Sequence, residues 1–202
     1  MVIKNIVFDI GNVLLKWQPI DITTKTFPNE LNPHSLARKI FESSIWLDLN
    51  RGKITEKEAI ILYYEDLNIS IEQLNDLLME VKRSLTPIDG SIELLNNVYD
   101  LGMPLYSITD NVREIVSFLK QKYNFFEKFI DIIVSAELGL LKPSKDIYLY
   151  LINKYKLIPE ETVFIDDLYQ NIEGAKAVGM HGIHFTTANK CREALKSLSI
   201  KV

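Results

Sequence analysis

The sequence predicts an α/β fold in which a parallel sheet is covered by helices on both faces, with a helical segment inserted after the first strand. Five short runs are apolar on consecutive residues, as in strands that are buried on both faces. Helical patterns separate these runs, and this alternation is typical of a parallel sheet. Residues 17–86, by contrast, contain helical patterns and no strand pattern. The expected architecture is therefore a Rossmann-like core with an inserted α-helical domain.

The strands and the helices between them can be assigned in chain order. The helices show apolar residues at helical spacing, and two of them end before a glycine, Gly102 or Gly179, which is a common helix stop. Strands are expected at residues 5–9, 105–109, 130–135, 163–166 and 182–185. Helices are expected at residues 91–101, 112–123, 145–155 and 171–178.

The inserted segment is expected to contain at least three helices, at about residues 32–41, 55–65 and 71–84. Two of them begin with a possible capping box, in which a side-chain hydroxyl and an acid or amide three residues later satisfy backbone N–H groups. These pairs are Thr55 with Glu58 and Ser70 with Gln73. The chain is accordingly divided into a core domain, residues 1–15 and 87–202, and a helical domain, residues 16–86.

Composition excludes several classes of protein. The 202 residues carry a net charge of −4 with no basic block, so nucleic-acid binding is not expected. Cys191 is the only cysteine, which fits a reducing compartment; it lies in a polar tail segment and is expected to have no catalytic role. No apolar stretch approaches the roughly 20 residues of a membrane helix, and no signal peptide is expected. A cytoplasmic protein is the resulting expectation, with its oligomeric state left open.

Polar residues follow four of the expected strands. These are Asp9, Thr109–Asp110, Lys142 and Asp166–Asp167. Ligands of an open parallel sheet bind outside the carboxyl ends of the strands, so these side chains are expected on one rim. Adjacent carboxylates bind Mg²⁺ through oxygen, and a carboxylate at a strand end can attack phosphorus. A hydroxyl and an ammonium group hold phosphate oxygens, so the set points to phosphoryl transfer.

Four motifs in order resemble those of the haloacid dehalogenase (HAD) superfamily. Residues 8–14, Phe-Asp-Ile-Gly-Asn-Val-Leu, look like its first motif, and residues 107–110 look like its second. Lys142-Pro143 and residues 165–171 look like its third and fourth. Together the motifs span most of the chain, and the helical insertion after the first motif matches the cap domain of the phosphatase branch.

The resemblance implies roles for the residues that match the first three motifs. Asp9 would be the nucleophile and a Mg²⁺ ligand, and Lys142 would bridge it to the phosphoryl group. Thr109 would bind the phosphate, helped by the backbone N–H of Asp110. The expected substrate is a small phosphorylated metabolite.

The fourth motif and the turn after Asp9 complete the implied site. Asp167 is expected to bind the metal directly and Asp166 directly or through water, while Asn171 orients their loop. Gly11 would give its backbone carbonyl to the metal, with the polar Asn12 beside it as a supporting residue.

Gly11 is also where this sequence departs from the family pattern. Most phosphatases of the superfamily carry a second aspartate there, which protonates the leaving group and then activates water. Such acid–base catalysis is typically worth about 10²–10⁴-fold. The form Asp-x-Gly-Asn-Val resembles a subgroup of sugar-1-phosphate phosphatases, whose anomeric leaving group has less need of an acid. A sugar phosphate such as glucose-1-phosphate is therefore a possible substrate.

Other functions remain open at this stage, among them a phosphotransferase or mutase, because slow hydrolysis of the intermediate favours transfer to another acceptor. A metal-independent 2-haloacid dehalogenase also lacks the second aspartate, but the pair Asp166–Asp167 argues against it. A non-catalytic protein that binds a phosphorylated ligand would also tolerate Gly11. For Trp17 and for the loop at residues 50–53, a role in the substrate pocket and a purely structural role are equally expected.

Overall fold

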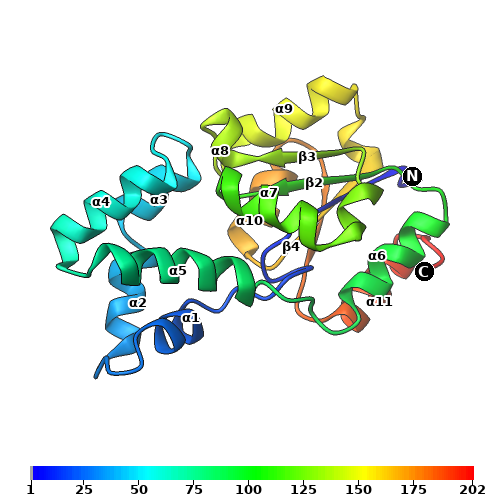
Figure 1. Ribbon diagram of the computed structural model, residues 1–202. Helices are drawn as coiled ribbons and strands as arrows, with labels where there is room; N and C mark the ends of the chain where they lie inside the picture. Colours follow the sequence, from blue (N-terminus) through cyan, green and yellow to red (C-terminus); the bar gives the residue numbers. More distant parts are fainter. Residues whose placement is uncertain (1) are drawn as a thin grey trace.

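The computed structural model describes residues 2–202, with Met1 outside the described part. Figure 1 shows a parallel sheet between layers of helices, and a helical segment beyond one end of it. In residues 2–202 the sheet has five parallel strands in the order β3-β2-β1-β4-β5. Their bounds are β1 Asn5–Phe8, β2 Leu105–Thr109, β3 Asp131–Val134, β4 Thr162–Asp166 and β5 His181–His184. The predicted α/β fold is confirmed, and each strand lies within two residues of its predicted position.

Helices cover both faces of the sheet because the buried strands are apolar on both. In β1, Val7 packs on one face and Ile6 and Phe8 pack on the other. The Val7 face is covered by α9 and α10, and the opposite face by α6, α7 and α11. These helices are α6 Ser91–Asp100, α7 Arg113–Lys122, α9 Lys145–Tyr155, α10 Tyr169–Lys176 and α11 Ala188–Ser197. Short turns complete the core: η1 Asn124–Lys128, α8 Ser135–Leu138 and η2 Pro159–Glu161.

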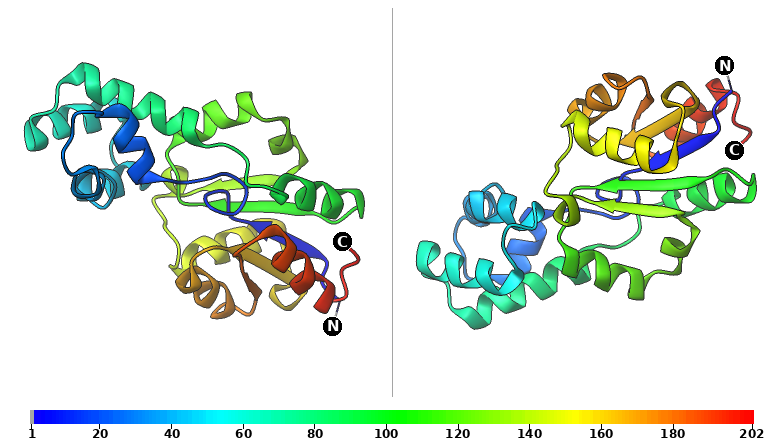
Figure 2. Two further views of the ribbon diagram at one scale, coloured as in Figure 1. Left: turned by 90° about the horizontal axis from the view of Figure 1, so that it is seen from below. Right: turned by 90° about the horizontal axis from the view of Figure 1, so that it is seen from above.

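The helical segment extends from the carboxyl ends of the strands, opposite the two chain termini (Figures 1 and 2). Its helices are α1 Pro19–Thr26, α2 Pro33–Phe41, α3 Ser44–Asn50, α4 Glu56–Leu67 and α5 Ile71–Ser84. Both predicted capping boxes are present, at the starts of α4 and α5. The chain leaves and re-enters the core side by side, since Leu15 bridges Pro87 and the N–H of Lys16 donates to the carbonyl of Thr86 at 2.8 Å. The division into residues 1–15 with 87–202 and 16–86 stays a prediction.

The sequence analysis was wrong about the last 15 residues. Instead of a polar tail segment, residues 188–197 form the amphipathic helix α11, which packs on the sheet through Cys191 and Leu195. The spacing of Ala188, Cys191 and Leu195 is helical and was the available signal. No helix among residues 2–202 has the length and apolar character needed to cross a membrane.

The Cys191 thiol is expected to be inert in the folded protein. It is 1% exposed, and burial raises its pKa to about 12, so the reactive thiolate is scarce at neutral pH. Native protein should therefore react with 5,5′-dithiobis(2-nitrobenzoate) at least about 100-fold more slowly than protein in 6 M guanidinium chloride. Stoichiometric labelling of the native protein within minutes would contradict this assignment.

Candidate active site

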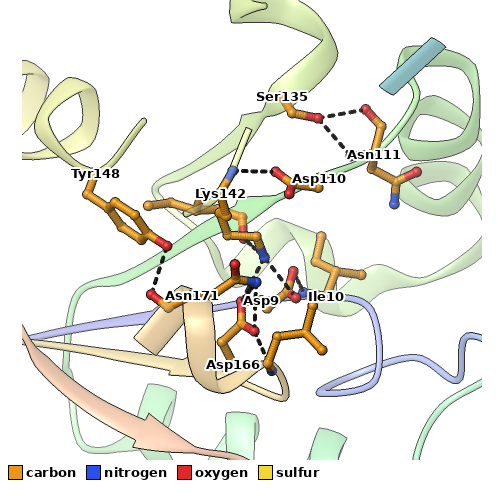
Figure 3. Close-up of polar contacts among 11 residues, drawn as sticks. Asp9, Ile10, Asp110, Asn111, Ser135, Lys142, Tyr148, Asp166 and Asn171 are labelled. Atoms are coloured by element: carbon orange, nitrogen blue, oxygen red, sulfur yellow. Dashed lines mark hydrogen bonds and ion pairs between the residues drawn. The ribbon is translucent and has the colours of Figure 1, made fainter. Parts of the chain in front are cut away.

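The residues singled out from the sequence come together where β1, β2 and β4 end. Figure 3 shows Lys142 reaching between Asp9, from the end of β1, and Asp166, the last residue of β4. The Nζ atom of Lys142 lies 2.8 Å from Asp9 Oδ2 and 2.8 Å from Asp166 Oδ2. It also donates to the carbonyl oxygen of Ile108 at 3.3 Å. One ammonium group therefore joins three neighbouring strands.

The charge on Lys142 is held by these carboxylates. Burial alone would lower its pKa, but Asp9 and Asp166 outweigh burial and raise the pKa above its usual range. The side chain is 2% exposed. A buried cation of this kind is stable only when it is paired, and it is available to neutralise negative charge that enters the cavity.

Asp9 combines a buried position with fixed geometry. Its Oδ1 accepts a 2.7 Å hydrogen bond from the backbone N–H of Ile10, and its Oδ2 faces Lys142. Burial raises the pKa of Asp9 well above its ordinary value, with a further contribution from Asp166, while Lys142 opposes the rise. A desolvated, oriented carboxylate is a suitable nucleophile, because little solvent must be removed before it attacks.

A cluster of carboxylates surrounds this position. Oxygen atoms of Asp9, Asp166 and Asp167 lie within 4.8 Å of one another. Burial raises the pKa of Asp167, and the neighbouring Asp166 adds to the rise. Three acids this close repel one another, and the single positive charge of Lys142 offsets only one of the three. Such a set of hard oxygen donors suits a divalent cation.

Asp166 is occupied by the protein itself. Its Oδ1 accepts from the N–H of Leu168 at 2.8 Å and from Asn171 Nδ2 at 3.0 Å, and its Oδ2 accepts from Lys142. Asn171, which the sequence analysis expected to orient this loop, donates hydrogen bonds to both carboxylate oxygens of Asp166. The same partners leave Asp166 few free lone pairs, whereas Asp167 lines the cavity. Of the two, Asp167 has the freer oxygen atoms.

Tyr148 on α9 is a supporting residue that sequence reasoning missed. Its hydroxyl donates a 2.8 Å hydrogen bond to the backbone carbonyl of Asn171 (Figure 3). The ring is fully buried and packs edge-on against Phe164 in β4. In the sequence Tyr148 is one of several aromatic residues at helical spacing, and nothing marks its hydroxyl as part of a site.

The second motif forms the opposite side of the site. Thr109 ends β2, is buried, and lines the same cavity as Asp9. Asp110 Oδ1 accepts from the backbone N–H of Lys142 at 3.1 Å, which fixes the start of the lysine loop. Burial raises the pKa of Asp110, and Lys142 opposes that rise. The side chain of Asp110 therefore positions Lys142, a role the sequence analysis did not assign to it.

The turn after Asp9 leaves room for a side chain at residue 11. Gly11 lines the cavity, and a Cβ built at this position meets no atom within 4 Å. Asn12 adopts a left-handed conformation, with φ of 51°, and its Oδ1 accepts from the N–H of Trp17 at 2.9 Å. The turn thus directs the chain toward the helical segment and holds Trp17 at its entrance.

A cavity of about 360 Å³ lies between the core residues around Asp9 and Lys142 and the helical segment. The segment contributes Trp17, Trp46, Asn50 and Leu85 to its lining. The open question about Trp17 has a mixed answer, since this residue lines the cavity and also packs on other aromatic rings. The core contributes Asp9, Gly11, Asn12, Thr109, Asp110, Asn111, Ile115, Lys142, Asp167, Leu168 and Asn171.

The loop at residues 50–53 docks on the core beside the cavity. The backbone carbonyl of Asn50 accepts a 2.7 Å hydrogen bond from the buried hydroxyl of Ser135. Ser135 Oγ also accepts from the N–H of Asn111 at 2.9 Å (Figure 3). Gly52, with φ of 65°, lies so close to the core that an added Cβ would overlap the carbonyl oxygen of Ala136. Asn50 faces the cavity, while Arg51 is not among its lining residues.

Comparisons with known proteins find relatives that match most of the chain. A family model described as haloacid dehalogenase-like hydrolase matches residues 3–179. A sesquiterpene phosphatase of Aspergillus oryzae is 26% identical over 91% of this chain and 90% of its own. A D-ribitol-5-phosphate phosphatase of Bacteroides thetaiotaomicron is 25% identical over 88% of this chain and 89% of its own.

Solved structures share the fold over nearly the whole chain. A HAD family enzyme of B. thetaiotaomicron in complex with magnesium and inorganic phosphate has a TM-score of 0.74 at 21% identity, covering 92% of this chain and 95% of its own. An L-2-haloacid dehalogenase from Xanthobacter autotrophicus has a TM-score of 0.69 at 16% identity, covering 96% and 83%. At these identities the likeness establishes the fold alone. It does not distinguish hydrolysis of a phosphate ester from displacement of a halide.

Proposed function

Because the chain belongs to the haloacid dehalogenase-like hydrolase family, we propose that it hydrolyses a small phosphomonoester through an aspartyl-phosphate on Asp9, with Mg²⁺ as cofactor. The family match confirms the predicted superfamily. The predicted enzyme class, a HAD-like phosphatase, is likewise confirmed by the phosphatases among its relatives. The nucleophile, the metal, the substrate and the cytoplasmic location stay proposals.

The observation that carries the proposal is that a buried carboxylate, a buried ammonium group and an acidic cluster lie together beside one cavity. Asp9 and Lys142 are each 7% exposed, and they face each other at 2.8 Å. Displacement of a halide from carbon needs the carboxylate nucleophile but has no use for Asp166 and Asp167 as a metal site. Phosphoryl transfer uses all four groups, because negative charge must be neutralised around phosphorus.

The donor set fits Mg²⁺ in type and number. Asp9 and Asp167 offer carboxylate oxygens, and Gly11, whose backbone carbonyl would be a third donor, lines the same cavity. Asp166 would act from the second layer, since its oxygens already bind Lys142, Leu168 and Asn171. When bound, the cation would act as a Lewis acid that lowers the negative charge on the phosphoryl oxygens.

The proposed reaction has two half-reactions, transfer of the phosphoryl group to Asp9 and hydrolysis of the resulting aspartyl-phosphate. Lys142 and Thr109 would hold phosphoryl oxygens while a carboxylate oxygen of Asp9 forms the new bond to phosphorus. The bond from phosphorus to the ester oxygen breaks, and the departing alkoxide takes its proton from water, because Gly11 has no side chain to supply one. Water then attacks the phosphorus of the aspartyl-phosphate, which releases inorganic phosphate and restores Asp9.

The helical segment, residues 16–86, is proposed to act as a cap domain over this site. It supplies one wall of the cavity through Trp17, Trp46, Asn50 and Leu85. Closure by such a segment excludes bulk water and strengthens the interactions between Asp9, Lys142 and the phosphoryl group. The docking of Asn50 on Ser135 supports this role.

The alcohol that carries the phosphate is not specified by the family. One phosphatase relative is named for a sesquiterpene and another for D-ribitol 5-phosphate. A sugar phosphate such as glucose-1-phosphate was predicted from the Asp-x-Gly-Asn-Val form, and it stays a prediction. Faster hydrolysis of glucose-1-phosphate than of glucose-6-phosphate would support it.

Removal of the metal tests the proposed function. Phosphate release from p-nitrophenyl phosphate should fall at least about 100-fold in excess EDTA and return with MgCl₂, since charge neutralisation by a metal is worth several kcal/mol. Chloride release from 2-chloropropionate, assayed in parallel, should be absent. Metal-independent chloride release without phosphate release would overturn the proposal in favour of a dehalogenase. Phosphate binding without turnover would instead favour a non-catalytic protein.

A further inference from the structure

We propose that the cavity accepts the phosphate ester of an apolar alcohol, a single ring or a short branched chain, and discriminates against polyols. This inference rests on the proposed function, because it concerns the alcohol of the same phosphomonoester, and it opposes the sugar phosphate predicted from the Asp-x-Gly-Asn-Val form. The observation behind it is the apolar part of the cavity lining, in particular Trp17 and Trp46. These two residues are called the aromatic wall.

The aromatic wall is preorganised. The rings of Trp17 and Trp46 stack with centroids 5.7 Å apart and planes 10° apart. Phe41 packs edge-on against both, at centroid distances of 5.2 Å and 5.0 Å. A cluster of three rings in mutual contact offers a fixed apolar surface, and an apolar ligand loses little free energy in ordering it.

Charged side chains are confined to the opposite end of the cavity. Asp9, Asp110, Lys142 and Asp167 all come from loops at the strand ends. Among the described residues, those that the segment 16–86 contributes to the lining carry no charge. The loop at residues 50–53 has two cationic residues, and both form ion pairs with Asp48: Arg51 at 4.0 Å and Lys53 at 2.9 Å.

The amides beside the wall are already partly used. Asn50 Nδ2 donates to the carbonyl of Trp46 at 2.8 Å, and Asn111 Oδ1 accepts from the N–H of Val112 at 2.9 Å. Each amide therefore keeps one end for a ligand. The several hydroxyls of a sugar outnumber these groups, and each hydroxyl buried without a partner weakens binding.

The size of the cavity limits the alcohol. About 360 Å³ must hold the phosphoryl group as well as the alcohol, and this volume is near the lower end of the ~300–1,000 Å³ typical of ligand sites. One ring or a short branched chain fits this space beside Trp17 and Trp46. Leu85 and Ile115, both buried, extend the apolar lining around it.

Binding of phosphonates tests the inference without turnover, because the carbon–phosphorus bond is not hydrolysed. In the presence of MgCl₂, calorimetry on the whole protein should give benzylphosphonate a Kd about 10- to 100-fold lower than that of methylphosphonate. Trp17 and Trp46 are the two tryptophans of the chain, so benzylphosphonate should also change the intrinsic fluorescence. Equal dissociation constants for the two phosphonates would overturn the inference.

Variants locate the effect. Trp46→Ala should remove most of the preference for benzylphosphonate, whereas Tyr64→Ala, at a half-exposed aromatic residue outside the cavity lining, should preserve it. Preference retained in a folded Trp46→Ala protein would overturn the inference. If Trp46→Ala does not fold, the comparison of the two phosphonates on the natural sequence still decides.

Hydrolysis separates this inference from the proposed function. Benzyl phosphate and glucose-6-phosphate both release a primary alcohol, so they differ mainly in the hydroxyls around the ring. Benzyl phosphate should have a kcat/KM at least about 10-fold higher. Faster hydrolysis of glucose-6-phosphate would overturn the inference and leave the phosphatase standing. Selective binding of benzylphosphonate without any phosphate release would support the inference and overturn the proposed function.

Discussion

Asp9→Asn should abolish phosphate release, with kcat lower by at least about 10⁴-fold, because the amide cannot form the bond to phosphorus. The fold should survive, since asparagine has the same shape and Lys142 keeps its 2.8 Å contact with Asp166. The measurement is single-turnover phosphate release in MgCl₂, together with a thermal melt. A labelled phosphoryl group should be trapped on the natural protein after acid quench and be absent from the variant.

The matched control for this experiment is Asp131→Asn. Asp131 begins β3, at the opposite end of the sheet from the cavity, and its Oδ2 lies 2.7 Å from Lys154 Nζ. Its loss should leave kcat within about twofold, since neither partner lines the cavity. Normal activity in a folded Asp9→Asn protein would show that another group attacks phosphorus, and the proposed mechanism would then be wrong.

Gly11→Asp should raise turnover of alkyl phosphates. Acid–base catalysis is typically worth about 10²–10⁴-fold, and a new carboxyl that is not fully oriented should recover at least about 10-fold of this in kcat. The backbone allows the change, because a Cβ at residue 11 meets no atom within 4 Å. The measurement is kcat for benzyl phosphate, whose alkoxide needs a proton, and for p-nitrophenyl phosphate, whose phenolate does not. The gain should be confined to benzyl phosphate.

Gly11→Asn is the control for this gain. It adds a side chain of the same size at the same place but cannot exchange a proton, so it should leave the ratio of the two substrates unchanged. An equal increase in both variants would mean that residue 11 acts through packing alone. The absence of any increase in Gly11→Asp would mean that another group already protonates the leaving alcohol.

The parts of the site that could be predicted are those that a short stretch of sequence identifies by itself. Asp9 and Asp166 follow buried apolar runs, and a carboxylate at such a place needs a cation. Because the strands are parallel, their carboxyl ends meet, so the proximity of Lys142 to both acids agrees with the sequence analysis. The fourth motif led to the expectation that Asn171 orients its loop, and Asn171 donates a 3.0 Å hydrogen bond to Asp166 in that loop.

The parts that could not be predicted depend on contacts between distant segments. Ser135 and Asn50 are 85 positions apart, and neither belongs to a motif. The wall made by Trp17 and Trp46 depends on the packing of α3, which carries Trp46. The sequence analysis missed α3 because this helix has only seven residues. Short helices carry too few apolar repeats to be recognised, and their packing fixes them instead.

The close approach of Gly52 to Ala136 has a consequence for the timing of the reaction cycle. With the loop docked, the Asn50 carbonyl accepts from Ser135, and Arg113 Nη1 donates to the Gly52 carbonyl at 3.4 Å. These contacts hold against the core the loop that carries Asn50, one of the residues that line the cavity. Opening of docked segments limits turnover in many enzymes, so we expect the lifetime of these contacts to influence how fast the product alcohol is released.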